Sequence, residues 1–211
     1  AETCGLIDAI GQWALKAACA QLVAWRAAGL AIDYISVNVS PRQLQASGFS
    51  EMVAEALQEF GLPASALHLE ITETAVLGEQ GAARANLAEL NDLGTPLELD
   101  DFGTGYSSLA HLQHLPVAVV KLDLAFIRPI HRDASALAVV RAAIEMAHAL
   151  GKSVVAEGVE LGQQVALLSQ MGCDVMQGYF LSAAVPADQL AALVRQRATA
   201  IPVQLLSQKR S

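Results

Sequence analysis

The chain of 211 residues carries a formal net charge of −8 at neutral pH and has a sequence pI of about 5.0. Its composition, 54% hydrophobic and 16% charged, supports a large buried core and excludes a disordered chain. The acidic balance argues against a nucleic-acid polymer or an anionic membrane surface as a partner, because both attract a basic face. A small anionic ligand stays compatible with this charge if local cations bind it.

Cysteine usage and hydropathy favour a reducing, aqueous environment. The three cysteines lie far apart and include no Cys-x-x-Cys pair, so we expect free thiols rather than a disulfide framework or a zinc site. The apolar segment 13–32 is interrupted by Lys16, Gln21 and Arg26, which is typical of an amphipathic helix and not of a membrane span. No signal peptide is evident and the sequence does not begin with Met. We therefore expect a part of a longer protein that is cytoplasmic, either free or below a membrane anchor.

Short apolar runs alternate with longer segments of helical periodicity along the chain. In chain order, the pattern predicts a helix over 5–29, a strand over 34–40, a helix over 49–61, a strand over 67–73, a helix over 74–93, strands over 96–103 and 117–123, a helix over 135–151, strands over 153–160 and 174–180, and a last helix over 187–197. Strands that alternate with helices are typical of parallel βα units, so the sequence predicts an α/β fold.

Polar and apolar side chains alternate within the predicted strands. Ser36 and Asn38 share one face of the first strand, and His68 and Glu70 share one face of the second. Helices can cover the apolar faces, so the polar faces must line an enclosed interior, as in a (β/α)8 barrel of the TIM type. An open doubly wound sheet, the alternative, would bury apolar side chains on both faces.

Six βα units are present where the barrel needs eight. Because the sequence begins with a helix, we expect the first strands of the barrel to precede Ala1. Residues 1–200 are then expected to form an incomplete barrel, and residues 201–211 a peripheral tail.

Each predicted strand ends in a polar side chain that should lie at the mouth of the barrel. These side chains are Asn38, Glu70, Asp100 with Asp101, Lys121 with Asp123, Glu157 and Gln177. Polar loops explain one or two such positions easily, but not six of six. Carboxylates crowded together stay ionised only if cations compensate them, and hard divalent cations prefer such oxygen ligands. Asp100 and Asp101 can coexist if Asp100 bridges two metal ions and Asp101 binds one of them.

Six motifs in this order, NVSPRQL, LEITET, LDDFGTGYSSL, KLD, AEGVE and MQGYF, resemble the successive signatures of the EAL-domain family. The likeness extends from Ala1 to about Ala192, and the first helix resembles the one that follows the family's first two strands. The resemblance implies a bacterial phosphodiesterase that hydrolyses cyclic di-GMP to linear pGpG with two Mg²⁺ or Mn²⁺ ions. It also leaves open a member that has lost catalysis and serves as a receptor for the dinucleotide.

The resemblance implies a role for each residue at the mouth. Asn38, Glu70 and Asp100 would hold the first metal ion, and Asp100 with Asp101 the second. A metal-bound water would attack the phosphodiester in line. Lys121 would position that water and neutralise charge on phosphorus.

Other residues would assist the reaction. Glu157 would be either the general base or a further metal ligand, and Gln177 would fix a water or an edge of the substrate. Tyr179 could stack on a guanine base or pack against the last helix, with equal weight. Supporting roles fall to Glu73, which would hold the DDFGTG loop, to Asp123, which would orient Lys121, and to Glu160.

Two inward-facing residues below the mouth are harder to interpret. By alternation, Glu98 should point into the barrel one layer below Asp100, where it either pairs with Lys121 or lies on a kinked strand. His68 faces inward below Glu70, as a partner of that carboxylate or as a packing residue.

The largest departure from the family concerns the glutamate of its Glu-Ala-Leu motif, a metal ligand expected on a strand before Ala1. Either that strand precedes the sequence, which we favour, or the molecule lacks the ligand; the 211 residues alone are expected to be inactive or nearly so. An unrelated metal-dependent barrel enzyme, such as an aldolase, is a weaker alternative. The family further implies a homodimer and an upstream sensory or GGDEF-type domain.

Overall fold

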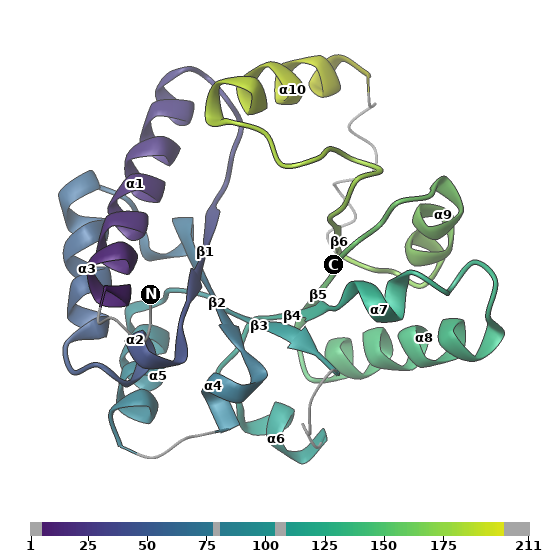
Figure 1. Ribbon diagram of the computed structural model, residues 1–211, viewed down its shortest axis with the longest axis horizontal. Helices are drawn as coiled ribbons and strands as arrows, with labels where there is room; N and C mark the ends of the chain where they lie inside the picture. The colour runs from purple at the N-terminus through teal and green to yellow at the C-terminus, as the bar shows by residue number, and fades with distance from the viewer. Residues whose placement is uncertain (1–5, 78–80, 104–108, 201–211) are drawn as a thin grey trace.

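The computed structural model is built on one sheet of six parallel strands and describes residues 6–77, 81–103 and 109–200 (Figure 1). The strands are β1 (Ile35–Val39), β2 (Leu67–Thr72), β3 (Leu97–Phe102), β4 (Val119–Leu122), β5 (Ser153–Ala156) and β6 (Val175–Met176). They lie side by side in chain order, and each pairs in parallel with the next. The sheet curls into an arc with most helices on its outer side. The predicted α/β fold, with six βα units of a TIM-type barrel, is confirmed.

Helices connect the strands, and some of them begin at a residue whose side chain caps the helix. They are α1 (Ile7–Ala27), α2 (Pro41–Gln45), α3 (Phe49–Phe60), η2 (Ala64–Ala66), α4 (Glu73–Leu77), α5 (Ala82–Leu93), α6 (Leu109–His114), α7 (Leu124–Ile127), α8 (Ala134–Ala149), α9 (Gly162–Gln170) and α10 (Ala187–Ala200). Ser40 starts α2 through a reciprocal capping box with Gln43. The Asp133 carboxylate starts α8 by accepting hydrogen bonds from the backbone N–H groups of Ser135 and Ala136.

Three predicted elements, one helix and two strands, differ from those observed. The single helix expected over 74–93 is two helices, α4 and α5, and Gly81 immediately before α5 has a left-handed φ of 76° that a helix cannot continue through. The last two strands are shorter than expected. The chain after β6 passes so close to Val159 that a Cβ atom on Gly178 would lie 2.3 Å from the Val159 nitrogen. Beyond the two strands, the loops stay joined by hydrogen bonds from Val159 N–H to the Gln177 carbonyl at 3.0 Å and from Phe180 N–H to the Val159 carbonyl at 2.9 Å.

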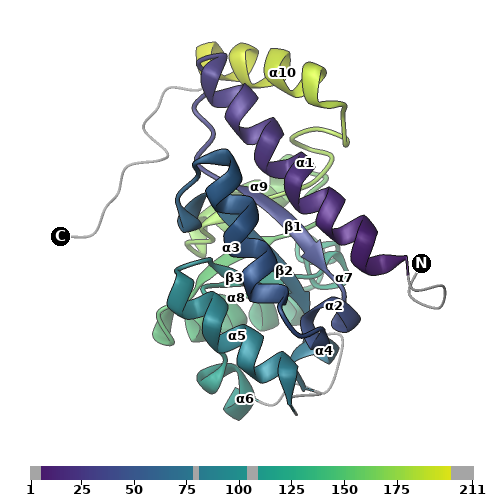
Figure 2. The same ribbon diagram turned by 90° about the vertical axis from the view of Figure 1, so that its left-hand side faces the viewer.

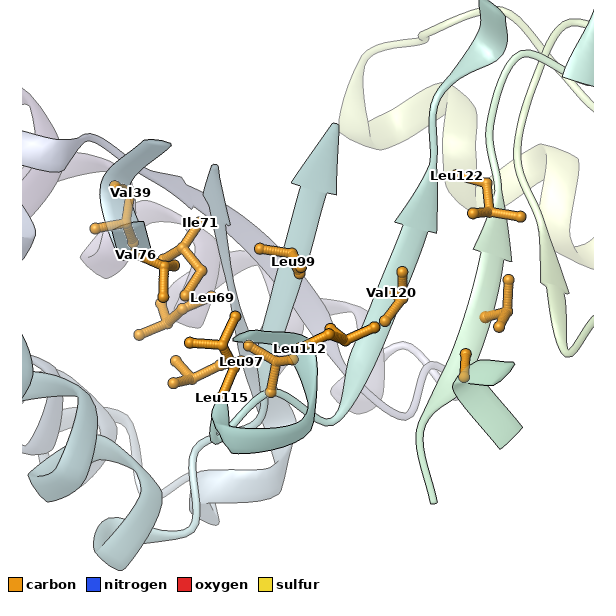
Figure 3. Close-up of a cluster of buried hydrophobic side chains, with 14 of the residues drawn as sticks. Val39, Leu69, Ile71, Val76, Leu97, Leu99, Leu112, Leu115, Val120 and Leu122 are labelled. Carbon is orange, nitrogen blue, oxygen red and sulfur yellow. The ribbon is translucent and has the colours of Figure 1, made fainter. Parts of the chain in front are cut away.

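The core lies between the outer face of the sheet and the helices. Leu69 and Ile71 of β2, Leu97 and Leu99 of β3, and Val120 of β4 are each at most 1% exposed. Figure 3 shows these side chains gathered in one cluster with Leu112 and Leu115. Their alternation with polar residues puts the apolar half of each strand outward and leaves the polar half on the inner face of the arc.

The first and last helices meet at one end of the molecule. Figures 1 and 2 both show α10 beside the end of α1. The Trp25 indole Nε1–H donates to the Ala187 carbonyl at 3.2 Å, and the Arg195 guanidinium donates to the Ala28 carbonyl at 3.3 Å. These bonds tie α10 to the C-terminal end of α1.

We predict that Leu99→Ala lowers the free energy of unfolding by about 3 kcal/mol, because it removes a fully buried side chain and leaves a cavity between sheet and helices. Urea unfolding followed by circular dichroism measures this change. Val139→Ala, at a side chain that is 52% exposed, is the matched control and should cost less than about 0.5 kcal/mol. Equal losses for both variants would contradict the assignment of Leu99 to the core.

Candidate active site

The carboxyl ends of the strands bring the polar side chains to one edge of the sheet. Asn38 of β1 and Glu70 of β2 are register partners, and Asp100 of β3 is the partner of Thr72, two residues beyond Glu70. Lys121 lies in β4. The backbone N–H of Glu157, just after β5, donates to the Leu122 carbonyl at 3.0 Å. Because the strands are parallel, all of these side chains meet at the same edge.

Lys121 is the centre of this edge. Its ammonium lies 2.5 Å from Oε2 of Glu70, 2.9 Å from Oδ1 of Asp100 and 2.8 Å from Oε1 of Glu157. The Lys121 side chain is only 4% exposed. Burial by itself would lower its pKa, but the hydrogen bonds that the ammonium donates to Glu157, Glu70 and Asp100 outweigh burial and raise the pKa above the ordinary value. The lysine is therefore charged at every physiological pH.

For the carboxylates around Lys121, burial is the dominant influence on the pKa. Burial raises the pKa of Glu70 and of Glu157 above that of an ordinary glutamate, although Lys121 partly offsets the rise. The pKa of Asp101 is also raised, first by burial and then by the neighbouring charges of Asp100 and Asp123. The single positive charge of Lys121 therefore does not balance the negative charges of these carboxylates.

The end of β3 is distorted so that two adjacent carboxylates reach the same place. In a regular strand, Asp100 and Asp101 would point to opposite faces. Here the pairing of β3 with β4 shifts register between Leu99 and Phe102, and Asp101 adopts a left-handed φ of 55°, at a cost of about 1 kcal/mol. Oxygen atoms of Asp100, Asp101 and Glu157 consequently lie within 4.8 Å of one another.

This donor set fits hard divalent cations. Carboxylate oxygens of Asp100, Asp101 and Glu157 converge within the distance that a shared ion or ion pair requires, and Asn38 of β1, the register partner of Glu70, offers an amide oxygen. Burial, together with the charge of neighbouring carboxylates, raises the pKa values of Glu70, Asp101 and Glu157, and a bound cation would relieve both effects. Thiol or imidazole groups, which softer metals prefer, are not part of the group formed by Asp100, Asp101 and Glu157.

Four other predicted site residues are placed around this edge with different degrees of exposure. Gln177 follows β6 and is held by its backbone, which donates to the Ala156 carbonyl at 2.8 Å and accepts from Val159 N–H at 3.0 Å. Tyr179 is 75% exposed, so it does not pack against α10. Asn38 and Glu160 are also exposed.

Two supporting residues have surroundings that the sequence did not specify. The Asp123 carboxylate accepts a hydrogen bond from Ala125 N–H at 2.8 Å and so begins α7; its role in orienting Lys121 stays a prediction. Glu73 is 5% exposed at the start of α4, and its carboxylate oxygens have no hydrogen-bond partner among the residues that the structure describes. The DDFGTG segment that Glu73 was expected to hold spans residues 100–105, and residues 104 and 105 of it lie outside the described part of the chain, so this role stays a prediction.

Glu98 does not pair with Lys121. Its Oε1 lies 2.6 Å from Nδ1 of His68 and accepts a hydrogen bond of 3.3 Å from the Ser36 hydroxyl. The expected irregularity of the strand is present, but it begins after Leu99 and so beyond Glu98. The sequence could place Glu98 on the inner face but could not supply the register that brings it to His68.

Sequence reasoning missed Gln164, a buried residue of α9 that supports the loop after β5. Its Oε1 accepts hydrogen bonds from the backbone N–H groups of Glu160 and Leu161, both at 2.8 Å. Its Nε2 donates to the carbonyls of Ile127 and Arg128 at 3.2 and 3.3 Å. The side chain thereby ties the segment after Glu157 to the end of α7. No helix was predicted between the last two strands, so no signal in the sequence pointed to a glutamine in the first turn of α9.

The tripeptide Glu-Ala-Leu occurs once in the sequence, at residues 55–57, but not at the end of a strand. These residues lie in the middle of α3, and Glu55 is exposed. Glu55 is therefore not a member of the group of carboxylates at the strand ends.

The fold and this edge define a TIM-type barrel domain with a candidate metal centre at the carboxyl ends of its strands. The family model described as the EAL domain matches residues 1–184. The chain belongs to the EAL domain family.

Solved and curated relatives agree with this assignment. The bifunctional diguanylate cyclase/cyclic di-GMP phosphodiesterase MucR of Pseudomonas aeruginosa is 39% identical over 194 residues, which are 92% of this chain and 28% of that protein. The structure of the PaMucR phosphodiesterase in complex with c-di-GMP matches with a TM-score of 0.83 at 39% identity, covering 90% of this chain and 76% of that one. The EAL domain of DcpA from Mycobacterium smegmatis matches with a TM-score of 0.82 at 39% identity, covering 88% and 84%.

The chain spans about a quarter of the length of the curated relatives that it matches, between 23% and 28% for three of them. Within the described ranges, none of the helices combines the length and the apolar character that a membrane crossing needs.

The raised carboxyl pKa values predict how stability depends on pH. A folded state in which Glu157 has a raised pKa binds its proton at a higher pH than the unfolded state, whose pKa is close to 4.5. The contribution of Glu157 to the free energy of unfolding should therefore rise as the pH falls from 7 toward 4.5, while Lys121 stays charged throughout.

Urea unfolding in EDTA between pH 5 and 8 (a window set by these ordinary pKa values) measures this dependence. The Glu157→Gln variant should show a shallower decline of stability with rising pH than the unmodified protein. An identical slope in the two proteins would show that Glu157 does not titrate in this window.

Proposed function

We propose that the chain is the catalytic barrel of a phosphodiesterase that hydrolyses cyclic di-GMP to linear pGpG with two Mg²⁺ or Mn²⁺ ions. The observation that carries the proposal is the convergence of Glu70, Asp100 and Glu157 on the Lys121 ammonium, with an oxygen of Asp101 within 4.8 Å of oxygens of Asp100 and Glu157. Membership in the EAL domain family, and the c-di-GMP complex of the solved MucR relative, support this choice of substrate.

Asn38, Glu70, Asp100 and Asp101 would hold the two cations, whose Lewis acidity would activate water and offset the charge of the phosphodiester. Glu157 is the best candidate for the general base. A pKa raised by burial brings a carboxylate closer to neutral pH, where it accepts a proton from the attacking water more effectively. Its second possible role, as a further cation ligand, is compatible with its position beside Asp100 and Asp101.

Lys121 would act on the phosphate. Its charge is fixed by three carboxylates at one edge of the sheet, so a phosphodiester that binds at this edge meets a preoriented cation. Gln177 and the exposed ring of Tyr179 follow β6 at the same end of the sheet, where they would contact the nucleotide and where the ring could stack on a guanine.

A second candidate function is binding of cyclic di-GMP without hydrolysis. The observation that favours it is that the sequence's one Glu-Ala-Leu tripeptide lies in α3, so the 211 residues contribute no glutamate from a strand of that sequence. The 211 residues alone are accordingly expected to show little or no activity.

We further propose a cytoplasmic location, a homodimer, and linkage to a sensory or GGDEF-type domain. The support for linkage is the short share of MucR that the chain spans, together with the bifunctional name of that relative. Sedimentation at micromolar concentrations tests the dimer, and a monomer throughout would reject it.

The test of the function is the conversion of cyclic di-GMP by the full-length gene product with Mn²⁺. We expect linear pGpG on chromatography, complete loss with EDTA, and recovery when Mn²⁺ is added back. Glu157→Gln should lower kcat by about 10²- to 10⁴-fold, because a general base contributes that much. Val139→Ala is the control and should leave kcat unchanged.

Two outcomes would decide against hydrolysis. Product no greater than that of the Glu70→Ala variant would reject the enzyme. Calorimetric binding of cyclic di-GMP without turnover, under the same conditions, would establish the receptor in its place.

A further inference from the structure

A second set of polar side chains lies on the inner face of the sheet, one layer below the candidate active site. It consists of Ser36 in β1, His68 in β2 and Glu98 in β3. Each of these residues comes two positions before Asn38, Glu70 or Asp100, respectively. Since side chains on a strand alternate with a period of two, each lies directly beneath a residue of the site on the same face. We call this set the inner polar layer.

The members of the inner polar layer are joined across three strands. His68 Nδ1 lies 2.6 Å from Glu98 Oε1, and the Ser36 hydroxyl donates to the same oxygen at 3.3 Å. An ionised carboxylate only accepts hydrogen bonds, so His68 is the donor in this pair. The ring of Tyr34 stacks on the imidazole with a centroid distance of 3.7 Å and an interplanar angle of 7°. The His68 and Glu98 side chains are 12% and 4% exposed, so little solvent competes for these bonds.

Glu98 is the member of the inner polar layer that could interfere with the candidate active site. It is the register partner of Glu70 on one side and of Val119 on the other, and Lys121 follows Val119 by two residues. Its carboxylate therefore lies within side-chain reach of Lys121, diagonally across β3 and β4. A buried carboxylate beside a buried ammonium would ordinarily pair with it, because leaving a buried charge unpaired is costly.

His68 and Ser36 prevent an ion pair between Glu98 and Lys121. They hold Oε1 of Glu98 toward β1 and β2 in the lower layer, while the Lys121 ammonium lies one layer above, among Glu70, Asp100 and Glu157. Glu98 and Lys121 thus have separate sets of partners, although both are buried on the same face of neighbouring strands.

We propose that His68 is a positioning residue which keeps Glu98 away from Lys121, so that the ammonium stays with Glu70, Asp100 and Glu157 in the arrangement that binds divalent cations and phosphodiester. The inference rests on the proposed function and deepens it. It assigns His68 no contact with the substrate, and it predicts that loss of His68 is harmful mainly because Glu98 is then free to compete for Lys121.

The experiment is a double-mutant cycle on the full-length gene product. Mn²⁺ affinity, read from the free-ion signal in electron paramagnetic resonance without nucleotide, is measured for the unmodified protein and for His68→Leu, Glu98→Gln and the double variant. Glutamine keeps the shape of Glu98 but has no charge with which to compete for Lys121. We expect His68→Leu to weaken Mn²⁺ binding by about tenfold, a typical effect of losing a residue that orients a ligand set. Glu98→Gln added to His68→Leu should restore the affinity to within about threefold of the unmodified protein, because the competing charge is gone.

The matched control is His148→Leu. His148 also pairs with a carboxylate, its Nε2 lying 2.8 Å from Oδ2 of Asp174, but it lies at the end of α8 and contacts no residue of the site. Its Mn²⁺ affinity should equal that of the unmodified protein, and thermal unfolding verifies that each variant is folded.

Failure of the second substitution to restore binding would overturn the inference, because it would show that His68 acts only through general stability. Unchanged affinity in His68→Leu would overturn it as well. These outcomes are independent of turnover. Rescue of Mn²⁺ binding in a protein that does not cleave cyclic di-GMP would support the inference while rejecting the proposed enzyme, and cleavage without any effect of His68→Leu would do the reverse.

Discussion

The candidate site depends on one interaction, the sharing of the Lys121 ammonium among carboxylates from three other segments. Glu70, Asp100 and Glu157 come from β2, from β3 and from the turn after β5, and all three lie within 2.9 Å of that nitrogen. Each pair is largely buried, so removing the ammonium would leave several negative charges facing one another with little water between them. The same contacts hold four successive segments of the sheet in a fixed lateral relation. Lys121 is therefore needed both for the stability of the sheet and for the arrangement of the candidate site.

Parallel strand order is what makes such sharing possible. Every strand of this sheet runs in the same direction, so a polar residue at each carboxyl end contributes to one edge, and a residue two positions earlier contributes to the layer beneath. The two layers differ in how their charge is satisfied. The upper layer has more carboxylates than cations, whereas Glu98 in the lower layer accepts hydrogen bonds from Ser36 of β1 and His68 of β2. The outer face of the same strands is apolar and buried, which fixes the register on which both layers depend.

The period of two in the sequence was sufficient to predict the strands, the inner face and the residues at the edge. It was insufficient wherever the backbone departs from a regular strand or helix. The left-handed conformation of Asp101 and the shifted pairing after Leu99 could not be predicted, because they depend on how β3 meets β4. The partner of Glu98 could not be predicted either, since a register between strands is needed to choose His68 over Lys121. The break before α5 and the early end of β5 were missed for a related reason. The left-handed torsion of Gly81 and the close approach of Gly178 to Val159 cannot be recognised in a single sequence.

The formal charges explain how an acidic domain could bind an anionic dinucleotide. Glu70, Asp100 and Glu157 share the Lys121 ammonium and Asp101 lies beside two of them, so these five side chains carry a formal charge of −3. That charge repels a phosphodiester, and in a site of low dielectric the repulsion is strong. Two divalent cations would change the formal charge to +1 and so would turn repulsion into attraction. The carboxylates, whose pKa values are raised first by burial and then by one another's charge, are relieved by the same ions. Cation binding and nucleotide binding would consequently be coupled, with the cations required first, and the charge at this edge rather than the net charge of −8 would determine which ligand the domain accepts.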